Sequence, residues 1–96
     1  MRVDFHPEAL AELQLAAAFY EAQRPGLGLR FVEAVQDAAA RIQESPDTGR
    51  VIDENVRRCL TRVFPYGVLY AVESDSIQVL AVGHLAREPG YWKARL

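Results

Sequence analysis

The chain has 96 residues, half of them hydrophobic, and a formal net charge of −2 at pH 7. This length favours a single domain over residues 1–96 with one hydrophobic core. The lone cysteine, Cys59, excludes an internal disulfide. We find neither a signal-peptide pattern nor an apolar run long enough for a membrane span, so we expect a cytoplasmic protein.

The first part of the chain predicts a short strand and two helices. Residues 2–5 alternate polar and apolar side chains, as a strand does. Residues 6–23 have apolar side chains at helical spacing and are rich in alanine. The Pro-Gly-Leu-Gly run at 25–28 interrupts this helix, and a second helix is predicted over residues 27–44. Because only a few residues join the helices, we expect an antiparallel helical hairpin.

The second part predicts three strands after a loop over residues 45–56. Residues 57–64 alternate along the first strand, residues 67–73 are rich in Val and Tyr, and residues 77–84 form the third. A tight hairpin at 73–76 joins the last two, and the tail ends in a helical turn. The order predicts an α+β fold, in which the helical hairpin packs on the N-terminal strand and a three-stranded antiparallel C-terminal sheet.

The residue inventory argues against several kinds of active site. His6 and His84 are the only histidines, and with Cys59 they provide no zinc-ligand spacing, so we expect no metal and no cofactor. Cys59 falls within a predicted strand and is expected to be a small buried side chain. The run at 25–28 lacks the following lysine and the strand–helix context of a phosphate-binding loop.

The charge distribution leaves one group of candidate functional residues. Residues 1–56 carry five basic and ten acidic residues, whereas residues 57–96 carry six basic and three acidic ones. This small basic excess does not favour sequence-specific DNA binding. Arginines beside aromatic rings are typical of RNA binding, and a histidine can act as a general acid or base. The candidates are Arg57, Arg58, Arg62, His84, Arg87, Tyr91, Trp92, Lys93 and Arg95. The alternative is structural: the arginines pair with carboxylates, and the aromatic residues pack the tail onto the domain.

The ordered set of motifs resembles the ParE/RelE superfamily of toxins from type II toxin–antitoxin modules. The resemblance runs over nearly the whole chain and is closest to the ParE-like branch. It rests on FHPEALAEL (5–13), YEAQRPGLGLRFVEAV (20–35), SPDTGR (45–50), RRCLTRVFPYGVLYAV (57–72) and IQVLAVGHLAREPGYW (77–92).

The resemblance implies a toxin that is neutralised by a cognate antitoxin. ParE-like members inhibit DNA gyrase by protein–protein contact, so it implies gyrase as the target and no catalysis. On this interpretation an acidic antitoxin segment would pair with the arginines of the predicted strand at 57–64, namely Arg57, Arg58 and Arg62. The tail would face gyrase through Arg87, Tyr91 and Trp92.

Two alternatives stay open. RelE-like members are metal-free, ribosome-dependent mRNA endonucleases, and such an enzyme would here use His84, Arg87 and Tyr91 as its catalytic residues. However, two arginines of RelE-like sequences are replaced by Gly67 and Leu85, which would remove stabilisation of transition-state charge. The other alternative is a degenerate, non-toxic member of the family.

Overall fold

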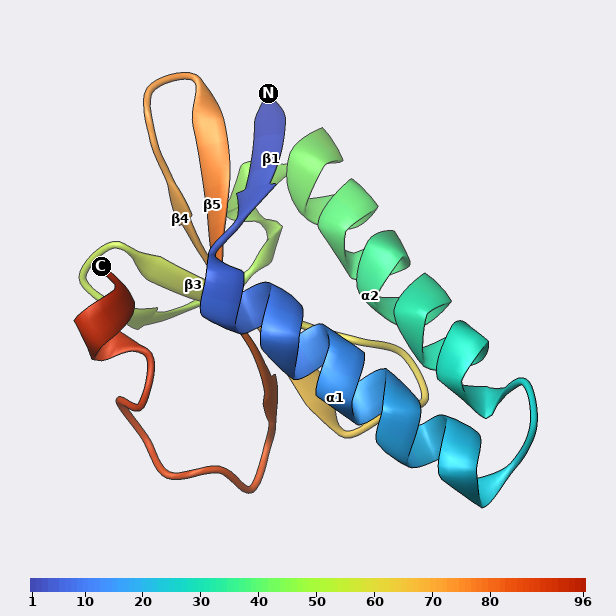
Figure 1. Cartoon of the computed structure of the whole chain (residues 1–96). Helices are drawn as coiled ribbons and strands as arrows, with labels where there is room; N and C mark the ends of the chain where they lie inside the picture. The colour runs from blue at the N-terminus through green and yellow to red at the C-terminus, as the bar shows by residue number, and fades with distance from the viewer.

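In the computed structural model, which describes residues 1–96, two helices cover one face of a five-stranded sheet (Figure 1). The helices are α1 (Pro7–Gln23) and α2 (Leu27–Glu44), and the strands are β1 (Arg2–Phe5), β2 (Arg50–Asp53), β3 (Val56–Leu60), β4 (Tyr66–Val72) and β5 (Ser76–His84). The sheet order is β1-β5-β4-β3-β2. Strand β1 runs parallel to β5, and all other neighbours are antiparallel. The predicted α+β fold is therefore confirmed.

The helical hairpin forms where the sequence predicts it. Gly26 has a φ of 88°, a left-handed conformation that favours glycine. A Cβ atom at Gly28 would lie 2.6 Å from the carbonyl oxygen of Ala17, so glycine allows the two helices to approach closely. The carboxylate of Glu21 accepts hydrogen bonds from the N–H groups of both glycines and closes the turn. Neither helix combines the length and hydropathy that a bilayer-spanning segment requires.

The main core lies between the helices and the sheet. Helix α2 buries one stripe of side chains, Phe31, Val35, Ala38 and Ile42, against the sheet. The sheet contributes Cys59, Val68, Tyr70, Ile77, Val79 and Val82. The expected burial of Cys59 is confirmed. Helix α1 buries only Ala9 and Ala16, although it is apolar around most of its circumference.

The C-terminal sheet has four strands, where the sequence predicts three. Residues 50–53, predicted as loop, form β2 and pair with β3. Turn residues dominate the segment just before β2, and β2 itself has only four residues. Four residues are too few to show a clear period of two, so this short edge strand leaves little signal in the sequence.

Strand β3 is shorter than the predicted strand at 57–64. It ends at Leu60, where the Thr61 hydroxyl shares its one hydrogen between the carbonyl oxygens of Phe64 and Tyr66, at 3.0 and 3.1 Å, and holds the turn. Arg62 therefore lies in the β3–β4 turn and not on the strand. Its neighbour Val63 has a φ of 76°, which is unusual for a β-branched residue.

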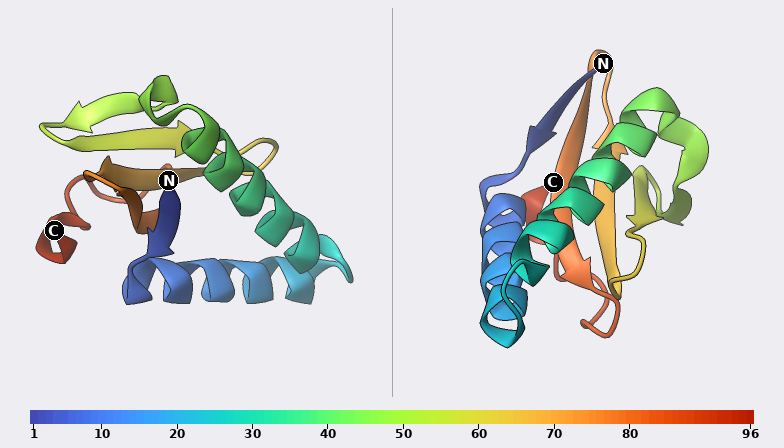
Figure 2. Two further views of the ribbon diagram at one scale, coloured as in Figure 1. Left: turned by 90° about the horizontal axis from the view of Figure 1, so that it is seen from above. Right: turned by 90° about the vertical axis from the view of Figure 1, so that its right-hand side faces the viewer.

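The tail, residues 85–96, crosses the sheet face opposite the helices. Figure 2 shows α2 and the C-terminus on opposite sides of the sheet. The tail ends in the short 3-10 turn η2 (Lys93–Arg95), which confirms the predicted last turn. A second, smaller core forms under the tail from Val56, Leu69, Leu80, Ala81 and Trp92.

Candidate functional site

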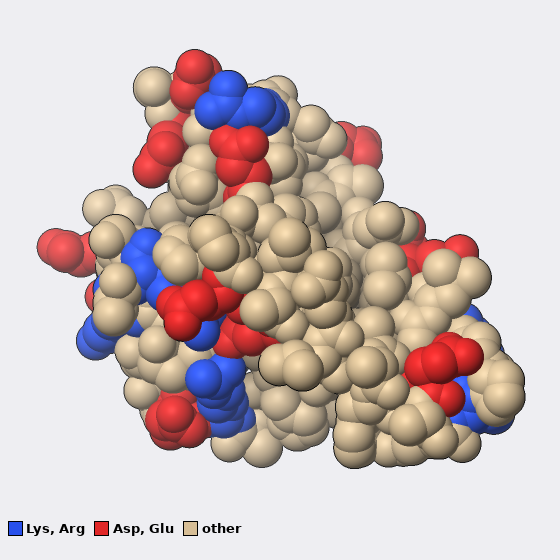
Figure 3. Space-filling model, viewed as in Figure 1, with Lys and Arg blue, Asp and Glu red and all other residues tan.

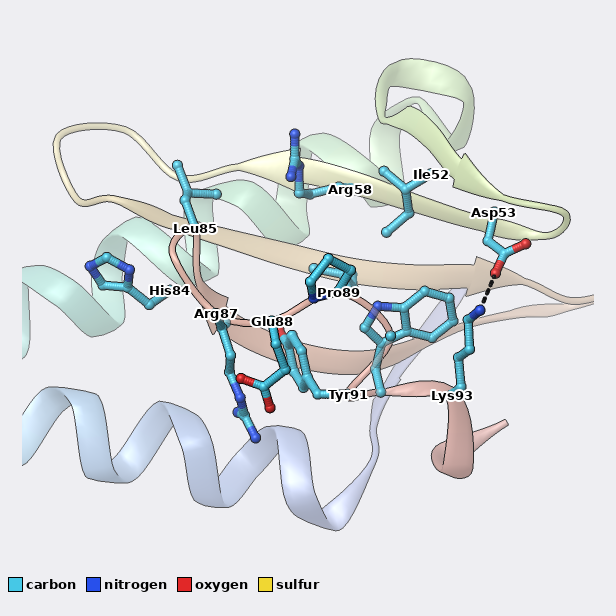
Figure 4. Close-up of a pocket in the computed structure, with 14 residues that line it drawn as sticks. Ile52, Asp53, Arg58, His84, Leu85, Arg87, Glu88, Pro89, Tyr91 and Lys93 are labelled. Carbon is cyan, nitrogen blue, oxygen red and sulfur yellow. Dashed lines mark ion pairs between the residues drawn. The ribbon is translucent and has the colours of Figure 1, made fainter.

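A cleft of about 350 Å³ opens between the tail and the strands on the sheet face opposite the helices (Figure 4). We call it the tail cleft. On the strand side it is lined by Ile52, Asp53, Arg58, Leu69, Gly83 and His84, and on the tail side by Leu85, Arg87, Glu88, Pro89, Gly90, Tyr91, Trp92 and Lys93. The fold thus brings together most of the basic and aromatic candidates.

The tail is anchored to α1 by one buried carboxylate that the sequence did not single out, Glu12. Its side chain is 14% exposed and accepts two hydrogen bonds from Arg95, at 2.8 and 3.0 Å. It also accepts hydrogen bonds from Arg87 and from the N–H of Val82. Burial alone would raise the pKa of Glu12, but these hydrogen bonds and the charge of Arg95 outweigh it and lower the pKa below its ordinary value. Glu12 is therefore ionised at neutral pH, and its carboxylate fixes both arginines of the tail to α1.

Tyr91 lies beside the two arginines that pair with Glu12. Its ring centroid lies 3.9 Å from the guanidinium carbon of Arg87 and 5.5 Å from that of Arg95. Burial and the negative charge of Glu12 raise the pKa of the Tyr91 hydroxyl. A Cβ atom at Gly83 would overlap that hydroxyl, so glycine on β5 makes room for the tyrosine. Tyr91 is thus a neutral, packed ring at physiological pH.

Trp92 and His84 have different surroundings from Tyr91. Trp92 is 5% exposed and belongs to the second core, so its ring packs the tail onto the domain. His84 is exposed at the end of β5; its Nδ1 accepts a hydrogen bond from the N–H of Ala86 at 3.0 Å. Its ring lies edge-on to that of Tyr66. Trp92 therefore has the structural role that the sequence left as an alternative.

The three arginines of the predicted strand at 57–64 lie in three different places. Arg57 donates to the carbonyl oxygens of Asp47 and Gly49 at 3.1 and 2.8 Å and fixes the loop before β2. Arg62 is exposed in the β3–β4 turn. Of the three, Arg58 alone lines the tail cleft.

The side chain of Arg58 passes over Gly67 on the neighbouring strand β4. A Cβ atom at Gly67 would lie 2.9 Å from both Cγ and Cδ of Arg58, and 3.6 Å from Cδ2 of Leu85. Arg58 takes part in none of the five ion pairs, and its buried Nε has no hydrogen-bond partner. The glycine thus makes room for an unpaired arginine from the next strand.

The comparisons with known proteins agree with this architecture. Residues 3–89 match the family model described as the ParE toxin of the type II toxin–antitoxin system parDE. No curated protein matches the sequence. Among solved structures, seven chains match, one of them described as the chromosomal ParDE TA system from P. aeruginosa. That structure has a TM-score of 0.65 and 20% sequence identity, over 88% of this chain and 95% of its own, so the likeness supports the fold.

Proposed function

The chain belongs to the family of ParE toxins from type II toxin–antitoxin systems, and on this basis we propose that it inhibits DNA gyrase by binding, without catalysis. The observation that carries the proposal is that Arg87, the one arginine among the nuclease candidates, is already paired with a carboxylate. Arg87 and Arg95 both donate to Glu12. An arginine neutralised in this way stabilises the charge of a cleaving phosphate poorly. Because its pKa is raised, the Tyr91 hydroxyl also stays protonated at neutral pH and is not available as a general base.

The tail is the proposed gyrase-facing surface. Its outer side carries Leu85, 46% exposed, and Arg87, whose side chain is 39% exposed. Glu12 and the buried Trp92 hold this segment in one conformation before a partner arrives. A pre-formed surface loses less conformational entropy on binding than a mobile one, which favours contact by protein–protein recognition.

The antitoxin would cover a different face. Leu15 and Phe19 on α1 are 72% and 59% exposed, one helical turn apart. Figure 3 shows the middle of α1 free of charged side chains, with charges gathered towards its two ends. Exposed apolar surface of this kind marks a protein-binding site, and an amphipathic antitoxin helix is the occupant that fits it. Both partners would be met in the cytoplasm.

A gyrase assay tests the proposal. The purified chain should inhibit supercoiling and stabilise cleaved plasmid DNA in the presence of gyrase, while mRNA in cells that express it stays intact. Leu85→Asp should abolish this effect, whereas Leu29→Asp, an equally apolar and 63% exposed position on α2, should retain it. Cleavage of mRNA at ribosomes would instead establish the endonuclease alternative. A folded chain that affects neither target would establish a non-toxic family member.

A further inference from the structure

We propose that Arg58 forms an anion site in the tail cleft, which binds one carboxylate of an acidic, extended antitoxin segment. The proposal rests on the proposed function, because it takes the antitoxin as the partner. The extended antitoxin segment would bind in the tail cleft, away from the apolar face of α1, and the Arg58 guanidinium would recognise its carboxylate.

Arg58 differs from the other cations of the cleft in having no counter-charge. Arg87 pairs with Glu12, and Lys93 pairs with Asp53 at 3.6 Å, as Figure 4 shows for the latter. No carboxylate lies within 4.0 Å of Arg58, and its Nε is buried without a hydrogen-bond partner. A buried, unpaired polar atom destabilises a fold, and a partner's carboxylate near this guanidinium would offset that penalty.

A second arginine increases the positive potential beside the cleft. Arg50 on β2 is the cross-strand partner of Arg58 on β3, so the two side chains share one face of the sheet. Like charges directly opposite each other are destabilising. Arg50 is exposed and likewise takes part in no ion pair. An anion bound between the tail and these strands would relieve the repulsion.

Gly67 leaves the space on β4 that the side chain of Arg58 fills. A side chain at this position would meet the stem of Arg58 at 2.9 Å and force the arginine away from β4. Figure 4 shows Arg58 on the strand side of the cleft, with Leu85 nearby and Glu88 and Tyr91 on the tail side. The guanidinium is thus held by packing alone, and its terminal nitrogens remain available to a ligand.

The lining of the cleft favours a single carboxylate over a nucleic-acid backbone. Asp53 and Glu88 line the same cleft and would repel a chain of phosphates, with one charge per nucleotide, more strongly than a ligand with a single charge. Ile52, Leu69 and Pro89 provide apolar walls beside Arg58. At about 350 Å³, the cleft lies near the small end of the range of ligand pockets. An extended peptide with one acidic side chain between apolar ones matches both the walls and the charge.

The only tryptophan of the chain, Trp92, lines the cleft and provides a direct signal for binding. The probe is the peptide acetyl-Ser-Val-Thr-Glu-Thr-Val-Ser-amide, in which the Glu lies between two valines on one face of the extended chain. It is titrated into the full chain while Trp92 fluorescence is recorded. We expect saturable binding that weakens about tenfold or more when the peptide carries Gln in place of Glu. Arg58→Gln should weaken it equally, and Arg58→Lys should retain part of the affinity. Arg30→Gln removes the same charge from the exposed surface of α2 and should have no effect.

Several outcomes would overturn the proposal. These are the absence of saturable binding up to millimolar peptide, equal affinity for the Glu and Gln peptides, or unchanged affinity in Arg58→Gln. A melting curve for each variant checks that it is folded. The purified toxin–antitoxin complex tests the source of the carboxylate: it should no longer bind the peptide, and unchanged binding would mean that the antitoxin leaves the cleft free. None of these measurements involves gyrase, so a failed gyrase assay and a failed peptide titration are distinguishable.

Discussion

Replacing Glu12 by Gln should destabilise the protein strongly, because it removes the buried carboxylate that anchors the tail to α1. The substitution keeps the shape of the side chain but removes the negative charge that Arg87 and Arg95 share. The side chain of Arg95 is 7% exposed, so water cannot replace the lost partner. The ring of Tyr91, which lies near the Arg95 guanidinium, would then lose the support of a fixed arginine and keep only its packing against Gly83 of β5.

The magnitude follows from the burial of the pair. Removing one partner of a fully buried ion pair costs roughly 3–5 kcal/mol, and a lost charged hydrogen bond about 1.5–3 kcal/mol. Glu12 is 14% exposed, and Gln retains one acceptor oxygen, so we expect a loss of about 2–4 kcal/mol in the free energy of unfolding. For a domain of this size, that lowers Tm by about 8–30 °C.

The assay is urea unfolding, followed by circular dichroism for the helices and by Trp92 fluorescence for the tail. Glu8→Gln is the matched control, since Glu8 pairs with the same arginine at 3.2 Å but is 65% exposed. An exposed pair contributes at most about 1 kcal/mol. If Glu12→Gln costs no more than Glu8→Gln, the tail is not held by the Glu12 carboxylate, and the reasoning is refuted.

Three further predictions concern the ionisation of Glu12, the packing of Tyr91 and the backbone at Val63. The pKa of Glu12 is lower in the folded than in the unfolded state, so its contribution to stability is present above the ordinary carboxyl pKa and is lost as pH falls through the folded pKa. The Tm should therefore fall more between neutral and acid pH in the wild type than in Glu12→Gln. Gly83→Ala should expel the Tyr91 ring and shift Trp92 fluorescence towards that of an exposed indole, whereas a normal spectrum would show that the tail can adapt. Val63→Gly should raise Tm slightly, since Val63 is 92% exposed with a φ of 76°; relief of about 1–2 kcal/mol of strain exceeds the roughly 0.5–1 kcal/mol of added chain entropy, and a lower Tm would contradict this.

The fold could be predicted from the sequence wherever local patterns are strong. Both helices and the turn at 25–28 follow from helical spacing and from glycine and proline signals, and the structure confirms them. The end of β3 could not be predicted, because it depends on the Thr61 hydroxyl, whose one hydrogen is shared between two carbonyl oxygens further along the chain. Strand β2 escaped prediction because four residues at a sheet edge carry almost no periodic signal.

The residue types of the candidate site could be predicted, but their pairings could not. Arg87 and Tyr91 stand out in the sequence as a cation and an aromatic ring in the tail. Glu12 lies more than seventy positions earlier and resembles any other acidic residue of a surface helix. Only the packing of α1 against β5 brings its carboxylate to Val82 and the tail. A polar residue on the inward side of an otherwise apolar helix is the one signal that would have suggested a buried partner.

Gly67 shows how the apparent loss of a positive charge in the sequence can have another interpretation in the structure. Taken alone, a glycine at the position where the resemblance to RelE-like sequences implies an arginine removes a cation from the sheet. In the structure, the space over that glycine is filled by the stem of Arg58 from the adjacent strand, so one cation lies beside the same point. A side chain at position 67 and the observed path of Arg58 exclude each other. Positions 58 and 67 therefore have to be interpreted as a pair. A sequence motif that considers position 67 alone misses the positive charge that Arg58 provides in the cleft.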